Sequence, residues 1–151
     1  MTVSLFWGKE EVQMQKAQYG ILRFAKYKGP EISNIEAHNE RKKEKYASNP
    51  DIDNSRGNLN YHLIEPVGKY RAESNRLIEE YGCRTRKDSV RVVEVLITAT
   101  PEFFKSKKKS EIRAYFQTAL EFIKKYQDSE TILSAVVHMD EKTPHMHLSF
   151  V

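Results

Sequence analysis

The segment from His138 to His147 constrains the fold more than any other part of this sequence, because it joins two strand-like runs through a short polar turn. The run 131–137 is apolar and rich in β-branched residues, which predicts a buried strand that ends at His138. The run 145–151 alternates with a period of two, which predicts a second strand with His145 and His147 on one face. We therefore expect an antiparallel hairpin in which His138 approaches the other two histidines.

Three imidazoles that converge in this way are typical of a divalent-metal site with open coordination positions. A single histidine on a strand face is more often packed or hydrogen-bonded, but three of the five histidines of the chain fall in this segment. We predict that His138, His145 and His147 are the metal ligands. Their ligand type alone would accept Zn²⁺, Ni²⁺ or Mn²⁺.

Two adjacent carboxylates, Asp140 and Glu141, lie in the turn between the ligands. Neighbouring turn residues cannot both point at one spot, so we expect one to orient a histidine and the other to face a nucleophile. A turn in which both side chains are simply solvated is the alternative, above all for Asp140.

The composition is that of a single domain with a preference for polyanions. The chain has 151 residues, of which 39% are hydrophobic, and 25 basic residues exceed 21 acidic ones. Cys83 is the single cysteine, which excludes a disulfide within the chain and fits a reducing cytoplasm. No apolar run approaches membrane-spanning length. The sequence ends inside a strand-like run, so we expect residues 19–151 to be a domain truncated at its C-terminus, after an extension over 1–18 that is disordered or not native.

The remaining patterns predict α+β architecture with a largely antiparallel sheet. Strands are expected at 19–27, 58–64 and 90–100 in addition to the hairpin. A helix is expected from Ser33, as N-cap, with Glu36 completing a capping box and the helix continuing past Arg41. A second helix is expected at 70–81, ended by Gly82. A third is expected from a stripe that packs on the sheet, formed by Ile112, Tyr115, Phe116, Ala119, Phe122, Ile123 and Tyr126.

Three separated patches resemble the N-terminal catalytic domain of the MobV (Pre/Mob) family of plasmid relaxases, within the HUH endonucleases. The patches are His38-Asn39-Glu40-Arg41, then Asp51-Ile52 with Ser55-Arg56 and Leu59-Asn60-Tyr61 up to Leu63, and finally the segment His138 to His147. The likeness runs from about Tyr19 to Val151. It implies a five-stranded antiparallel sheet flanked by helices. It also implies an enzyme that nicks one strand of single-stranded or supercoiled plasmid DNA at the transfer origin and stays bound to the 5′ phosphate.

The resemblance also implies roles for single residues. His38 would be the nucleophile, Glu141 the base and Mn²⁺ or Mg²⁺ the metal. An arginine on the same helix face as His38 could hold the scissile phosphate by a bidentate contact, which is the role expected of Arg41. The residues expected to contact DNA are Arg41, Lys42, Lys43, Arg56 and Asn60. The fragment is expected to be a monomer, with any dimerisation region in the missing part.

Three alternatives stay open. Tyr46 is the second choice for the nucleophile. A nuclease that activates water with the same histidines would release free ends without an adduct. A DNA-binding protein could hold the metal for structure alone, although such a site normally has a fourth protein ligand.

Overall fold

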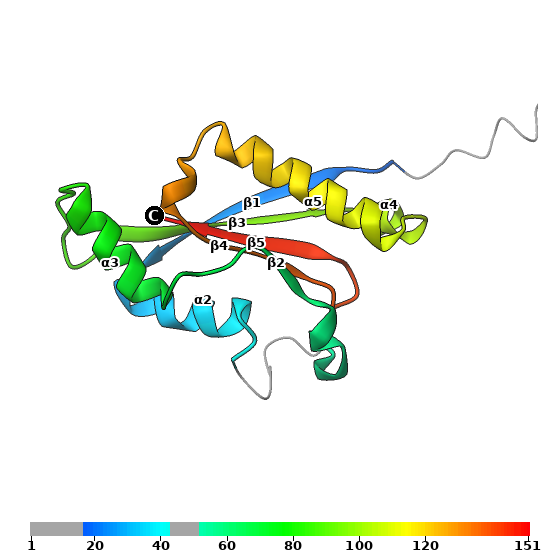
Figure 1. Cartoon of the computed structure of the whole chain (residues 1–151), viewed down its shortest axis with the longest axis horizontal. Coiled ribbons are helices and arrows are strands. Elements are labelled where there is room, and N and C mark those ends of the chain that lie inside the picture. The colour runs from blue at the N-terminus through cyan, green and yellow to red at the C-terminus, as the bar shows by residue number, and fades with distance from the viewer. Residues whose placement is uncertain (1–16, 43–51) are drawn as a thin grey trace, which may run out of the picture.

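The computed structural model describes residues 17–42 and 52–151, and it contains one five-stranded sheet with helices on both faces (Figure 1). The strand order is β1-β3-β5-β4-β2, and every neighbouring pair is antiparallel. The strands are β1 Gly20–Lys28, β2 Tyr61–Ile64, β3 Val90–Ala99, β4 Ile132–His138 and β5 His145–Phe150. The predicted α+β class and five-stranded antiparallel sheet are confirmed.

The helices form two layers, one on each side of the sheet (Figure 1). On one side lie α4 (Pro101–Lys105) and α5 (Lys109–Lys124), and on the other lie α2 (Ile32–Asn39) and α3 (Tyr70–Glu80). Three short 3₁₀ helices connect the elements: η1 Gly29–Glu31, η2 Asn54–Leu59 and η3 Ser129–Thr131. None of the helices among the described residues is both long and apolar enough to cross a membrane.

The main hydrophobic core lies between the sheet and α5. Alternate residues of the central strands, such as Val95, Ile97, Met146 and Leu148, are fully buried or nearly so on this face. The helix contributes Ile112, Phe116, Leu120 and Ile123. A smaller core on the opposite face joins α2 and α3 to the sheet through Ile32, Tyr70, Leu77, Val92 and Leu133.

The predicted stripe of α5 is partly wrong. Phe122 and Tyr126 are 47% and 78% exposed, whereas Leu120, which the stripe omitted, is buried. The buried positions 112, 116, 120 and 123 follow the steps of four and three that keep one helical face turned to the sheet. Residue 122 is rotated off that face by one position, so its ring contacts that of Tyr126 in a T-shaped arrangement at the surface instead.

The first helix also differs from the prediction. It begins at Ile32 after η1, so Ser33 is not the N-cap and Glu36 completes no capping box. Glu36 is buried and accepts hydrogen bonds from the Tyr70 N–H and from Lys42. The helix ends at Asn39, and Arg41 lies beyond it with a positive φ of 51°.

The second strand is shorter than predicted. Residues 58 and 59 belong to η2, whose start is held by the Asp53 carboxylate accepting from the Ser55 N–H at 3.0 Å. Helix α3, the second predicted helix, ends as predicted, because Gly82 takes the left-handed conformation with φ 66°. Its buried side is formed by Tyr70, Ser74 and Leu77, and Tyr81 is exposed.

Candidate metal and nucleophile site

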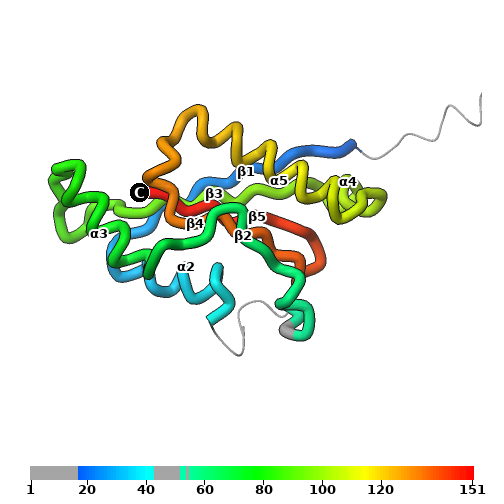
Figure 2. Tube along the Cα trace, viewed as in Figure 1, coloured from blue at the N-terminus to red at the C-terminus, as the bar shows by residue number. Residues whose placement is uncertain are grey.

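The β4–β5 hairpin brings its three histidines together as predicted. His138 pairs with His145 across the hairpin and Val136 pairs with His147, so all three imidazoles lie on the face that α2 covers. The ring centroid of His138 lies 5.3 Å from that of His145 and 4.8 Å from that of His147. The Cα trace shows α2 beside this hairpin although the two are distant in the sequence (Figure 2).

One nitrogen of each imidazole is held by an acceptor of the protein. His138 Nε2 lies 2.7 Å from the carbonyl oxygen of Asn39, and His145 Nδ1 lies 2.9 Å from that of Thr143. His147 Nδ1 lies 2.6 Å from a carboxylate oxygen of Glu94. Carbonyl and carboxylate oxygens only accept, so these three nitrogens carry the protons. The other nitrogen of each ring then presents a lone pair.

Two of these lone pairs are buried without a partner. His138 Nδ1 and His147 Nε2 form no hydrogen bond with any residue that the structure describes. A buried polar atom left in this state costs roughly 1–3 kcal/mol. The third, His145 Nε2, lies 2.8 Å from Glu141 Oε2, which is also an acceptor. Two lone pairs at this distance require a proton or a metal cation between them, so the donor set fits a divalent metal ion.

His38 lies in the last turn of α2 and faces the same cluster. Its ring centroid is 5.4 Å from that of His147 and 6.1 Å from that of His138. Burial, followed by the charges of His147 and Arg41, lowers the pKa of His38 to about 4. Burial likewise holds the pKa of His138 far below its ordinary value. His38 therefore has a lone pair at neutral pH without losing a proton.

The possible ligand atoms form two overlapping sets. His38, His138 and His147 offer atoms within 4.8 Å of one another, and so do His138, Glu141 and His145. The predicted three-histidine set bridges these groups through His138. Glu141 and His38 are thus near enough to complete the coordination, in addition to the base and nucleophile roles expected of them.

The second carboxylate of the turn, Asp140, is buried rather than solvated, which excludes the solvated-turn alternative for it. Both of its oxygens accept from Arg41 at 2.8 Å, and Asn60 donates to it at 2.9 Å. Burial works to raise the pKa of Asp140, but the hydrogen bonds from Arg41 and Asn60 outweigh it and hold that pKa below its ordinary value. Asp140 orients an arginine and not a histidine.

Arg41 links the two carboxylates to α2. Its guanidinium also donates to Glu141 Oε2 at 3.0 Å and to the carbonyl oxygen of His38 at 3.1 Å. The positive φ of Arg41 turns the chain back so that the side chain reaches the hairpin from beyond the helix end. The bidentate contact expected with a phosphate is made here with Asp140, and a phosphate contact stays a prediction.

A profile of the family described as "Plasmid recombination enzyme" (Mob_Pre) matches residues 16–151, nearly the whole chain. The chain belongs to this family. A plasmid recombination enzyme of Lactiplantibacillus plantarum is 38% identical over 137 residues, covering 88% of this chain and 38% of that protein. A type 1 enzyme of Staphylococcus aureus is 37% identical over 138 residues, covering 88% of this chain and 34% of that protein.

Solved structures of the MobM relaxase domain, Mn-bound and in complex with plasmid pMV158 oriT DNA, have the same fold as this Mob_Pre chain. Two of them are 33% identical to this chain with TM-scores of 0.79 and 0.82, covering 88% of it and 70% of the MobM chain. The chain thus spans just over a third of the length of the curated relatives and about two thirds of the MobM domain.

Sequence reasoning missed two site residues of this Mob_Pre chain. Glu94 stands in the middle of the apolar strand β3 and is 7% exposed. An acidic residue within so apolar a run was the available signal. Burial works to raise its pKa, but hydrogen bonds from His147 and Asn39 outweigh burial and lower it. Asn39 is the second missed residue. Its side-chain amide donates to Glu94 at 2.8 Å, and its backbone carbonyl accepts from His138, so it links Glu94 to that histidine.

The residues expected at DNA lie in different environments. Lys42 pairs with Glu36, and Arg56 is exposed on η2. Asn60 uses both ends of its amide to hold the turn, donating to Asp140 and accepting from the Met139 N–H at 2.6 Å. Lys43 and Tyr46 lie outside the described residues, as do residues 1–16 of the predicted extension. These DNA contacts stay predictions.

His62 has a structural partner in Glu40. Its Nε2 lies 2.9 Å from both carboxylate oxygens of Glu40, at the C-terminal end of α2. The pair ties strand β2 to the helix that carries His38.

Proposed function

We propose that this chain nicks one DNA strand at the transfer origin of a plasmid or mobile element, through a covalent 5′-phosphoryl-histidine on His38. The observation that carries the proposal is the position of His38. An imidazole with a depressed pKa faces two buried, unpartnered nitrogen lone pairs, those of His138 and His147. Similarity to the Mn-bound MobM domain in complex with origin DNA supports the same reading.

The substrate phosphate would lie in the hollow beside His38. This hollow is lined by His38, Glu141, Thr143, His145 and His147, together with apolar residues of β1 and β3. His138, His145 and His147 would hold a divalent ion, Mn²⁺ in the first place and Mg²⁺ in the second. Such an ion, when bound, withdraws charge from the non-bridging phosphate oxygens as a Lewis acid.

The transesterification balances with the residues present. The lone pair of a His38 nitrogen attacks the phosphorus, a phosphorus–nitrogen bond forms, and the bond from phosphorus to the 3′ oxygen breaks. The imidazole ring carries one N–H proton that becomes acidic in the adduct. Glu141, whose negative charge acts on His38, takes that proton and passes it to the leaving 3′ oxygen, which ends as a hydroxyl. Reversal of the same steps rejoins the strand.

The buried ion pair positions this base. Arg41 holds Asp140 and Glu141 at once, while Asn60 fixes Asp140 from the other side. Glu141 therefore cannot swing away from the histidines without breaking a charge-assisted hydrogen bond. In the same way Glu94 and Asn39 fix the rings of His147 and His138.

A direct test uses the chain with Mn²⁺ and single-stranded oligonucleotides that carry a plasmid transfer origin, labelled at the 3′ end. The label must be at this end because His38 would keep the 5′ phosphate of the downstream fragment. We expect a labelled protein band that survives denaturation, and that is lost in His38→Phe and after EDTA. Labelled fragments without a protein adduct would show a hydrolytic nuclease instead. Binding without cleavage would show a DNA-binding protein.

The cellular setting belongs to the same proposal. The substrate is plasmid DNA, so the chain would act in the bacterial cytoplasm. We propose a monomer for this segment, which a single species in sedimentation at micromolar concentration would support.

A further inference from the structure

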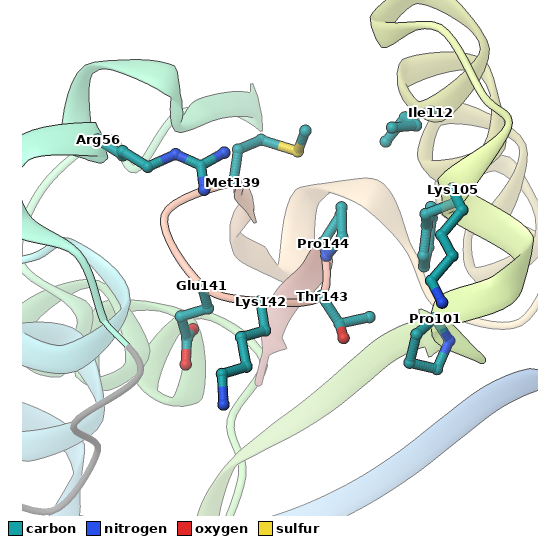
Figure 3. A pocket seen from close by; sticks show the side chains of 10 residues that line it. Arg56, Pro101, Lys105, Ile112, Met139, Glu141, Lys142, Thr143 and Pro144 are labelled. Atoms are coloured by element: carbon teal, nitrogen blue, oxygen red, sulfur yellow. The ribbon is translucent and has the colours of Figure 1, made fainter.

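A second hollow lies on the other side of the β4–β5 turn, between the turn and the helices α4 and α5 (Figure 3). We call it the turn–helix pocket. Its walls are mainly apolar, with Met139 and Pro144 from the turn segment and Ile112 from α5. Cationic side chains surround it from three separate elements: Arg56 from η2, Lys105 from α4 and Lys142 from the turn (Figure 3).

The turn–helix pocket adjoins the nucleophile site. Pro101, Glu141 and Thr143 line both this pocket and the hollow that contains His38, His145 and His147. Only the narrow turn separates the two. A DNA strand bound at His38 that continues toward α4 therefore passes the end of the sheet at Thr143 and then reaches the turn–helix pocket.

Size and charge together select the occupant. The cavity volume is about 220 Å³, below the roughly 300–1,000 Å³ of sites for drug-sized ligands, and suits a group as small as one nucleobase. Three cations face the pocket against a single carboxylate, Glu141, so an anionic group is favoured at its rim. An apolar slot with a cationic rim matches one unpaired nucleotide, whose base avoids water while its phosphate binds cations. A paired base cannot enter such a slot.

We propose that the turn–helix pocket binds one unpaired nucleotide of the DNA strand, adjacent to the scissile phosphate. The base lies against Met139 and Pro144, and the flanking phosphate lies on Arg56 and Lys105. The inference rests on the proposed nicking function, because that function places DNA at His38. It adds that the strand crosses the end of the sheet and that its next nucleotide enters this pocket.

The test compares three labelled probes in binding experiments that need no cleavage: oligo(dT), an abasic oligonucleotide of the same length, and a duplex. The chain should bind oligo(dT) more tightly than the abasic strand. Met139→Ala should weaken oligo(dT) binding by about fivefold or more and leave abasic binding unchanged, because the base loses the apolar surface of Met139 against which it is buried. Met139→Leu, which keeps the apolar volume, should bind normally.

The rim is tested by charge. Arg56→Ala and Lys105→Glu are exposed changes that should leave the melting temperature unaltered. Each should weaken binding of both single strands, and Arg56→Ala should lower the slope of log affinity against log salt by about 0.7, the value for one phosphate. Lys87→Ala, an exposed residue in the segment that joins α3 to β3, is the matched control and should change neither quantity.

The outcomes separate the two proposals. If the adduct forms on His38 but Met139→Ala weakens both strands equally, the pocket proposal is wrong and the nicking function stands. An unchanged slope of log affinity against log salt in Arg56→Ala would also overturn the pocket proposal. If no adduct forms while the probes are discriminated as expected, the pocket binds single strands and the nicking function fails.

Discussion

The two faces of strand β5 are both buried, but one belongs to the hydrophobic core and the other to the histidine site. Met146 and Leu148 are fully buried in the apolar core beneath α5. His147, between them in sequence, is 8% exposed and lies in a polar layer with Glu94 and Asn39 beneath α2. One face gains stability from burial, at roughly 25 cal/mol per Å² of apolar surface. The other buries nitrogen lone pairs without partners, which costs stability.

The difference shows where the fold gives up stability for chemistry. Polar side chains on the α2 face are held by other protein groups in an arrangement that leaves lone pairs directed at a common point. Such an arrangement is stable only because the opposite face of the same strands is well packed. Mutations of neighbouring residues on one strand should therefore have different effects. On the α2 face they should mainly reduce activity, and on the α5 face they should mainly reduce the free energy of unfolding.

The largest effect is expected from the adjacent pair His147 and Leu148. His147→Ala should abolish adduct formation, and its free energy of unfolding in EDTA should fall less than that of Leu148→Ala, because removal of the unpartnered Nε2 partly offsets loss of the hydrogen bond to Glu94. Leu148→Ala should lose about 2–5 kcal/mol of unfolding free energy through the cavity it leaves. Urea unfolding and adduct yield measured on both variants check this. A His147→Ala protein with full adduct yield would exclude His147 as a ligand.

The next largest effect is the increase in stability that Mn²⁺ binding should give. Mn²⁺ at 100 times its dissociation constant should raise the unfolding free energy by about 2.7 kcal/mol, since the unfolded chain has no assembled site. The gain should disappear in His138→Ala and persist in Leu148→Ala, although the latter is less stable. Thermal melts with and without Mn²⁺ provide the measurement. If Mn²⁺ stabilised His138→Ala as much as the parent chain, the metal would bind at another site.

Glu94→Gln sharpens the comparison within the polar layer. The amide can still accept from His147 Nδ1 but carries no charge, so Mn²⁺ affinity should fall about 10–100-fold while the fold is retained. Calorimetric titration with Mn²⁺ gives the affinity. Glu79→Gln, on a helix surface far from the histidines, is a suitable control. Unaltered affinity in Glu94→Gln would mean that packing alone orients His147.

The last effect is a loss of stability in acid. In the metal-free protein the pKa of His38 is lowered to about 4, below the ordinary value of 6.5. The unfolded state therefore binds more protons between these values, and stability should fall as the pH drops from 6.5 towards 4. Urea unfolding at both pH values should show a smaller loss in His38→Phe than in the parent chain. An equal loss would mean that His38 titrates normally.

Much of the site could be predicted because its residues follow local rules. The period of two in 145–151 and the β-branched run before His138 are sufficient to predict the hairpin and the face of each histidine. The positions of Glu94 and Asp140 could not be predicted in this way. Their burial depends on partners more than forty residues away in sequence, His147 and Arg41, and no local pattern specifies such pairs.

The end of α2 was mispredicted for a related reason. The polar residues after Asn39 continue a pattern that suits a helix, yet Arg41 leaves it with a positive φ. The ion pairs of Arg41 with Asp140 and Glu141, which form only in the folded domain, offset the strain of that conformation. Tertiary contacts therefore override local propensity at the point where the helix reaches the site.

The central claim is that His38 forms the bond to DNA, and the chemical stability of the adduct tests it most directly. A phosphorus–nitrogen link survives alkali and breaks in mild acid, whereas a phosphotyrosine link resists acid. We expect an adduct that is stable in alkali, labile in acid and absent from His38→Phe. An acid-stable adduct that persists in His38→Phe and disappears in Tyr46→Phe would contradict the account and assign the bond to the tyrosine.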